Sequence, residues 1–313
     1  MKEVLDILDH SDPSVRYRLH KDILKSDIKV LKSIQDDMLK VGWGYTLMSF
    51  QNEDFYWAGY YQPKWTSTHY TLQTLRCLNY PKTASIIHAI NRIVSEEKCN
   101  DGGISPSRTK LWSDCCVNGM FLNIACYYEV DEKPLESMID YLIKAQINDD
   151  GFNCSFNRSK VHHSAFNSTL CVIEGLYEYE LKGYTYRLDE VKRLRQEAEE
   201  FLLVHQLYIS DKTGKVIDPR YCSCHFPYYW RYDLLRVLDY FVYSEHPYDI
   251  RLESALVWLE SIQKNYQFKI NAHYPGLTYF EMEKAGKISQ MITVRALNIL
   301  NYYDRLKINE NVL

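Results

Sequence analysis

Two kinds of helical segment alternate along this chain, and that alternation constrains its fold more than any other feature. Residues 112–128 carry no charge after Asp114, and residues 162–181 carry none before Glu174. Residues 188–205 instead place apolar side chains on one stripe and charges elsewhere. A helix that is apolar all round is buried, whereas a helix with one apolar stripe covers a core from outside. The alternation therefore predicts an inner and an outer layer of helices.

Asp-containing turns separate these segments at a regular period. They occur at residues 54–55, 101–102 and 150–151, about 50 residues apart, which is typical of a helical repeat. The remaining predicted helices are residues 12–24, 30–50, 65–79, 82–98, 134–146, 228–243, 249–264 and 289–303. A Gly-containing loop is expected at residues 99–110, and no segment predicts a strand.

These repeated helix pairs favour an all-α fold. We expect an α/α toroid of roughly five to six helical hairpins, with an inner and an outer ring, and an open α-solenoid is the alternative. Residues 1–28 are predicted to form an N-terminal helical cap, and residues 29–313 the toroid as a single domain. Asp12 is the expected N-cap of the first predicted helix, with Pro13 at its first position.

Composition limits the expected partners. The net charge is −4 and no basic field is present, so nucleic acid is not an expected partner. The longest uncharged run, residues 115–128, is shorter than the roughly 20 apolar residues of a membrane span. Because the N-terminus lacks an apolar signal stretch and the nine cysteines form no framework, we expect a cytoplasmic protein with reduced thiols. The 27 tyrosines favour half-buried helix faces or a ring-lined cavity, although a Tyr-rich genome explains the count equally well.

Several sequence blocks resemble the terpenoid cyclase and protein prenyltransferase superfamily. Residues 146–152 read QINDDGF and are similar to its Q-x-x-D-G-G-W motif, with Asp150 in place of one Gly and Phe152 in place of Trp. Residues 101–104 are a truncated copy, and residues 51–57 and 263–268 are weaker ones. The block order is similar to that of bacterial squalene-cyclase-like proteins: DPSVRY, PKWTSTHYTL, DCCVNGM, HSAFNSTLCVIEGL, VIDP, FPYYWRYDLLR and HYPGLTYFEME. The resemblance covers nearly the whole chain and implies the toroid, but no particular reaction.

The resemblance also implies a central cavity whose mouth is formed by the starts of the inner helices. An isoprenoid or similar small apolar ligand would suit it, because apolar burial contributes about 25 cal/mol per Å2 and aromatic rings stabilise carbocations. The candidate residues at those starts are Trp65, Thr66, His69, Asp114, Cys116, His162, His163, Asn167, Trp230, Arg231, Asp233, Met291 and Arg295.

Two reactions of the superfamily place different demands on these residues. A cyclase of the proton-initiated class needs a D-x-D-D acid, and the nearest match here, at residues 148–150, lies in a turn. Binding or an unassigned step is therefore favoured over cyclisation. A prenyltransferase needs zinc, held by D-x-C and a later His. Asp114 and Cys116 fit D-x-C, but the His position falls on Asn167 or Ser168.

His163 lies one turn earlier and would be the substitute ligand, since residues i and i+4 share a helical face. A zinc site of Asp114, Cys116 and His163 with an open fourth position is chemically sound. The alternative is structural: a helix-capping Asp114, a core Cys116 and an interior His163. Asp114, His163 and Asp233 are the candidate catalytic residues under the enzymatic interpretation.

Other motifs give weaker signals. Residues 222–225 read CSCH, a spacing tighter than that of usual zinc sites, and they are expected to be a local loop feature. Asp233 and Glu281 would be the paired carboxylates of a carbohydrate-active α/α barrel, although Asp233 is more simply paired with Arg231, Arg236 or Arg295. A non-catalytic scaffold for unknown protein partners is the remaining alternative, and it predicts an exposed apolar patch.

Overall fold

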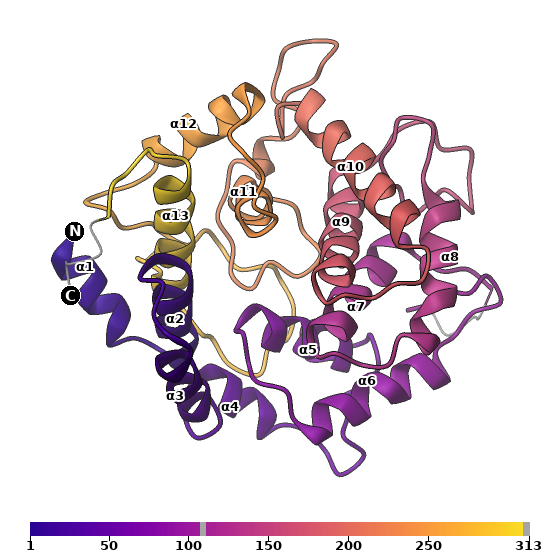
Figure 1. The fold of residues 1–313 in the computed structure, drawn as a ribbon, viewed down its shortest axis with the longest axis horizontal. Helices are drawn as coiled ribbons and strands as arrows, with labels where there is room; N and C mark the ends of the chain where they lie inside the picture. The colour runs from indigo at the N-terminus through magenta and orange to yellow at the C-terminus, as the bar shows by residue number, and fades with distance from the viewer. Residues whose placement is uncertain (107–110, 309–313) are drawn as a thin grey trace.

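The computed structural model describes residues 1–106 and 111–308, and it confirms the all-α expectation for these ranges (Figure 1). The α-helices are α1 (Lys2–Asp9), α2 (Pro13–Arg18), α3 (Ile28–Met38), α4 (Gly42–Met48), α5 (Thr68–Cys77), α6 (Ala84–Glu96), α7 (Cys115–Tyr127), α8 (Glu136–Ala145), α9 (Phe166–Leu181), α10 (Leu188–Val204), α11 (Leu234–Tyr243), α12 (Glu253–Ser261) and α13 (Gln290–Tyr302). A π-helical turn (Leu19–Ile23) and 3-10 turns at Lys133–Leu135, Pro219–Tyr221 and Ile250–Leu252 complete the helical elements. Within the described ranges, β pairing is limited to isolated bridges. The last four residues of the loop expected at 99–110 lie outside those ranges.

The helices are arranged as the burial pattern suggests. In Figure 1, α4, α6, α8, α10 and α12 lie toward the periphery, and α5, α7, α9 and α11 lie inside them. Helix α5 packs on α7, α7 on α9, and α11 on α13, while α13 also packs on α2. Most side chains of α7 and α9 are buried, whereas α10 buries a stripe and exposes its other face. Among the described helices, none has both the length and the hydrophobicity needed to cross a membrane.

The prediction of a single helix at residues 30–50 is wrong, because the structure has two helices there. Helix α3 ends at Met38 and α4 begins at Gly42, whose φ of +90° favours glycine. Asp12 explains the break. One of its carboxylate oxygens caps α2 by accepting from the Ser14 N–H at 2.9 Å, and the other accepts from the Trp43 N–H at 2.7 Å. The N-cap role of Asp12 is confirmed, and the same side chain starts α4.

Two inner helices begin later than predicted. Helix α9 begins at Phe166 rather than at 162, and α11 begins at Leu234 rather than at 228. Asp233 is extended and accepts from the Arg236 N–H at 2.8 Å, which fixes the start of α11. His163 and Arg231 therefore lie in the segments that lead into helices, not on helices.

The Asp-containing turns are structural connections. At the three Asp-containing turns, and also at the turn before α13, a backbone N–H donates to a side chain at the start of the following inner helix. These pairs are Trp57 to Thr68, Ile104 to Asn118, Phe152 to Thr169 and Phe268 to Thr293, at 2.9–3.1 Å. Because its Phe152 N–H donates to α9, the turn at residues 146–152 connects one helical hairpin to the next.

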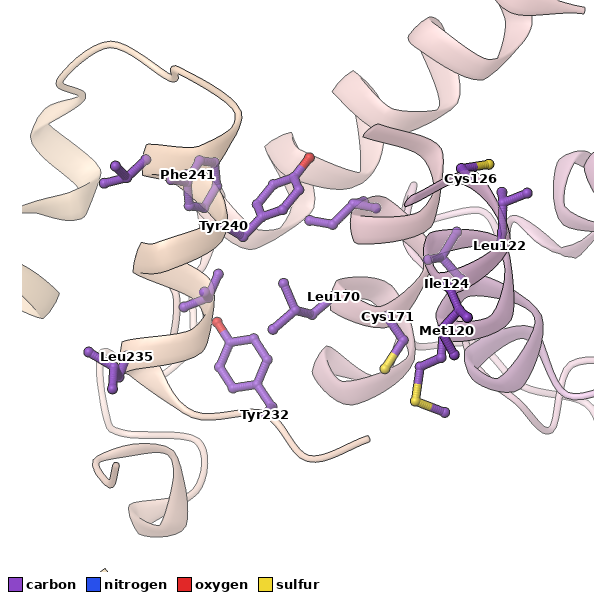
Figure 2. Packing of buried hydrophobic residues seen from close by; sticks show 14 of the residues in the cluster. Met120, Leu122, Ile124, Cys126, Leu170, Cys171, Tyr232, Leu235, Tyr240 and Phe241 are labelled. Atoms are coloured by element: carbon purple, nitrogen blue, oxygen red, sulfur yellow. The ribbon is translucent and has the colours of Figure 1, made fainter. Parts of the chain in front are cut away.

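Helices α7 and α9 approach each other closely through two glycines. A Cβ added to Gly119 would lie 2.4 Å from the carbonyl oxygen of Cys171, and one added to Gly175 would lie 2.3 Å from that of Gly119. Figure 2 shows Met120 of α7 beside Cys171 of α9, and Tyr240 extending from α11 toward α10, where its hydroxyl donates to Glu199. This packing places the C-terminal half of α9 against the centre of the molecule.

Candidate functional site

A charged cavity of about 60 Å3 lies among the inner helices. Its walls come from α2, α5, α7, α9, α11 and α13. Its charged residues are Arg18, Lys21, Asp22, Arg76, Glu174, Arg236, Asp239 and Arg295. The sequence-based expectation of an apolar interior is therefore not met at this point, since cations dominate the lining.

A wider groove of about 840 Å3 shares a wall with the cavity, since both are bordered by Arg18, Lys21 and Asp239. Tyrosines gather along the groove at the C-terminal ends of the inner helices, and lysines lie beside them. The tyrosines are Tyr17, Tyr127, Tyr128, Tyr177, Tyr243 and Tyr302, and the lysines are Lys21, Lys25, Lys32, Lys82 and Lys182. The opening thus lies at the opposite end of the inner helices from the predicted mouth.

Asp239 of α11 joins two arginines at one wall of the cavity. Arg18 donates to its two carboxylate oxygens at 3.0 and 2.9 Å, and Nε of Arg295 donates to it at 2.8 Å. Burial alone would raise the pKa of Asp239, but the charges of Arg18 and Arg295 outweigh it and lower the pKa to about 2. Asp239 is therefore an anion at neutral pH that is shared between α2 and α13.

Two further ion pairs connect α9 to its neighbours. Arg236 of α11 binds Glu174 with two hydrogen bonds of 2.9 and 2.6 Å. Arg76 of α5 donates to Glu178 at 2.7 Å, one turn further along α9. The bidentate Arg236–Glu174 pair fixes geometry as well as charge. They hold α5, α9 and α11 together around the cavity.

Arg295 has donors that these pairs leave unused. Its two terminal nitrogens are buried and have no hydrogen-bond partner within the described ranges, and the side chain is 2% exposed. The Tyr228 ring lies 5.2 Å from this guanidinium and 4.3 Å from that of Arg236. A buried charged donor without an acceptor is costly. The site is therefore suited to an anionic group beside Arg295.

Lys21 adds to the positive charge at the opening. Burial lowers its pKa, Asp22 opposes that effect, and the nearby charges of Arg18 and Arg76 lower it further. The pKa shift has the direction expected for a lysine in a site with more cations than carboxylates. An anionic ligand would reverse that imbalance.

The predicted site residues are distributed over three places. Arg295 lines the central cavity. Trp65 and Glu281 line a separate pocket of about 260 Å3, where the Trp65 ring stacks on Tyr229 at 4.0 Å. Asn167 and Arg231 line a third pocket of about 300 Å3.

His69 lies away from these three pockets. It is fully buried under the rings of Tyr60, Tyr61 and Tyr70. Both of its ring nitrogens lack a partner within the described part of the chain. Burial lowers the pKa of His69 to about 3, so the ring is neutral.

The residues proposed for zinc have other partners. Asp114 forms an ion pair with Arg158, and Cys116 lies against Cys154. His163 is exposed in the loop before α9, where its carbonyl accepts from Asn153. Across residues 1–106 and 111–308, no group of three or more His, Cys, Asp or Glu side chains is arranged to hold a metal ion. The three side chains, as they are arranged here, thus do not fit the expected zinc site.

The carboxylates expected for a carbohydrate-active site also have separate partners. Asp233 is fully buried, and one of its oxygens accepts from the His225 backbone N–H at 3.2 Å. Glu281 is half exposed and lies 3.1 Å from His273. Asp233 does not line the pocket that contains Glu281. The geometry therefore gives no support to a paired-carboxylate mechanism.

The residues that sequence reasoning missed are mainly the charges of the cavity. The inner helices are mostly apolar but carry a few isolated charges, namely Arg76, Glu174, Glu178 and Asp239. That isolation is the sequence feature that could have indicated a buried charged site. A charge on an otherwise buried helix needs a partner. His225 was also missed, because the CSCH spacing directed attention to zinc.

Three thiols come together where the loop before α9 meets the start of α7. The Cys154 sulfur lies 2.7 Å from that of Cys116 and 3.6 Å from that of Cys115. Hydrogen bonds with Cys115 and Cys116 hold the pKa of Cys154 below its usual range, which favours its thiolate. Since a disulfide requires sulfurs about 2.05 Å apart, a small movement suffices.

We expect the oxidant diamide to take two electrons and two protons from this pair and form a Cys116–Cys154 disulfide. Tryptic peptides 111–144 and 145–158 should then be linked, and mass spectrometry would detect them. Cys154→Ser should abolish the link, whereas Cys222→Ser, at a distant half-buried thiol, should not. Recovery of both peptides unlinked, with alkylated thiols, would contradict the expectation.

Comparison with known proteins adds no assignment. A scan against protein-family models gave no match, and a search of curated proteins found none similar to this chain. The geometry of the cavity and the residues around it are therefore the basis for assigning a function.

Proposed function

We propose that this chain is an α/α toroid that binds an amphipathic ligand with an anionic head group, such as a prenyl diphosphate, in its central cavity. The alternation of peripheral and inner helices in Figure 1 supports the toroid, as does the resemblance of its turns to squalene-cyclase-like proteins. The observation that carries the ligand class is the pair of buried, unpartnered terminal nitrogens of Arg295.

The head group would lie among the charged side chains of the central cavity. Arg295 offers two parallel N–H groups, a geometry that matches a phosphate or carboxylate. Arg236, Arg76 and Lys21 line the same cavity and add positive charge. Because the ion pairs already position these side chains, an anion meets preorganised donors.

The tail would follow the tyrosines of the groove. Tyrosine rings bury apolar surface while their hydroxyl groups remain hydrogen-bonded or hydrated, and the groove of about 840 Å3 has room for a prenyl chain. A hydrocarbon without a head group, such as squalene, would leave Arg295 unpaired when water is displaced. The geometry thus favours a diphosphate-bearing ligand over squalene, and binding over proton-initiated cyclisation.

Calorimetric titration with farnesyl diphosphate, inorganic diphosphate and squalene tests the proposal. Farnesyl diphosphate should bind most tightly, inorganic diphosphate more weakly, and squalene not at all. Arg295→Gln should weaken farnesyl diphosphate binding by about tenfold or more, since a hydrogen bond to a charged group contributes about 1.5–3 kcal/mol. Thermal denaturation establishes that the variant is folded.

Arg305→Gln is the matched control, because Arg305 pairs with Glu253 away from the cavity and should leave binding unchanged. Equal affinity for farnesyl and inorganic diphosphate would remove the isoprenoid from the proposal. Binding of squalene alone, or unchanged affinity in a folded Arg295→Gln variant, would overturn it.

A further inference from the structure

A second pocket lies at the other end of the inner helices. It has a volume of about 300 Å3 and forms where residues 218–232 and 271–274 meet the start of α9. Arg231, His225, Asn167 and Tyr274 line it. None of these residues borders the central cavity or its groove. The pocket therefore requires its own explanation.

Arg231 is a half-buried cation without a carboxylate partner in the described ranges. Its guanidinium lies 4.2 Å from the Trp230 ring and 5.2 Å from the Tyr274 ring, and its Nε is buried with no hydrogen-bond partner. The acidic residue on the pocket lining, Asp218, is already paired with Arg220. Two rings thus position a guanidinium that is free to bind an oxyanion.

His225 lies beside this cation with its orientation fixed. Its Nδ1 is 3.3 Å from Asp233 Oδ2 and 3.2 Å from the Ser223 hydroxyl, and its ring stacks on Tyr274 at 4.4 Å. Asp233 is itself held by the backbone N–H groups of Arg236 and His225. With Nδ1 directed to a carboxylate, Nε2 is the nitrogen left for a ligand.

We propose that this pocket is a second ligand site, which binds a small molecule through a carboxylate or phosphate on Arg231, with His225 as a neighbouring polar contact. Asp233, Ser223 and Tyr274 hold the imidazole so that Nε2 is left for the ligand. Arg231 supplies the positive charge and the oriented imidazole supplies a hydrogen-bonding group.

Calorimetric titration with inorganic phosphate and with succinate measures the affinity. The wild type should bind at least one probe, and the tighter probe assigns the oxyanion class. Arg231→Gln should weaken binding by about tenfold or more.

Arg193→Gln is the control on exposed α10, and it should leave the affinity unchanged. Diethyl pyrocarbonate labelling of His225, detected on tryptic peptide 221–231, provides a measurement in the unmutated protein, and the probe should protect the ring. Absence of binding by both probes, binding unchanged in Arg231→Gln, or a His225 ring that the bound probe leaves unprotected would overturn the proposal.

Discussion

Replacing Asp239 by asparagine should lower the free energy of unfolding by about 3–5 kcal/mol, because removing one member of a buried ion pair leaves its partners uncompensated. The effect is large here since the single carboxylate of Asp239 serves both Arg18 and Arg295. Asparagine keeps the shape of the side chain and removes the charge. Urea denaturation at pH 7 measures the change, with an unaltered dependence on urea as the sign of a two-state transition.

The stability difference between the wild type and Asp239→Asn should also depend on pH. The folded-state pKa of Asp239 is about 2, below the value of about 3.9 in an unfolded chain. A depressed pKa contributes stability that is present above the unfolded pKa and is lost as pH falls through the folded pKa. The difference between wild type and Asp239→Asn should therefore shrink as pH falls from about 4 to about 2.

Asp36→Asn is the matched control, because Asp36 pairs with Lys32 on an exposed face of α3. Surface pairs contribute about 0–1 kcal/mol, so this variant should remain close to the wild type at every pH. A stability difference for Asp239→Asn that stays constant between pH 7 and pH 2 would show that the carboxylate is not stabilised as an anion. The ion network around the central cavity would then need another explanation.

Sequence periodicity predicted the helices because the uncharged face of each helix is buried and the charged face is exposed. It failed where a distant side chain decides a boundary. The break between α3 and α4 depends on Asp12, which lies 31 residues before the Trp43 N–H that it accepts from. Likewise, the 3.6-residue period cannot distinguish a helical start from the extended segment at residues 162–165, whose Ser164 is held by Asp149.

The candidate site shows the same limit. The inner-helix starts were predicted to converge, and Asn167 and Arg231 do line one pocket because Asn167 lies in the first turn of α9 and Arg231 precedes α11 at the same end. The charged cavity was not predicted, because its pairs join residues far apart in sequence: Arg236 is 62 residues from Glu174, and Arg18 is 221 from Asp239. Charges isolated in apolar helices signal that partners exist, but only the packing of α2, α9, α11 and α13 identifies them.

Gly175→Ala should lower the free energy of unfolding by about 1–3 kcal/mol, the usual cost of overpacking, although alanine is the better helix former by about 1 kcal/mol. The added Cβ would lie 2.3 Å from the carbonyl oxygen of Gly119, a backbone atom that cannot rotate away. Helices α7 and α9 would have to separate. Chemical denaturation measures the loss.

Asn91→Ala is the control for helix propensity, because Asn91 is exposed on α6 and the substitution should raise stability by a few tenths of a kcal/mol. The two variants are thus expected to change stability in opposite directions, since only Gly175 faces a neighbouring backbone. Stabilisation by Gly175→Ala would mean that the glycine pair does not set the distance between α7 and α9. The positions of Glu174 and Glu178 at the cavity would then lose their structural basis, because α9 carries both carboxylates on the helix that this contact positions.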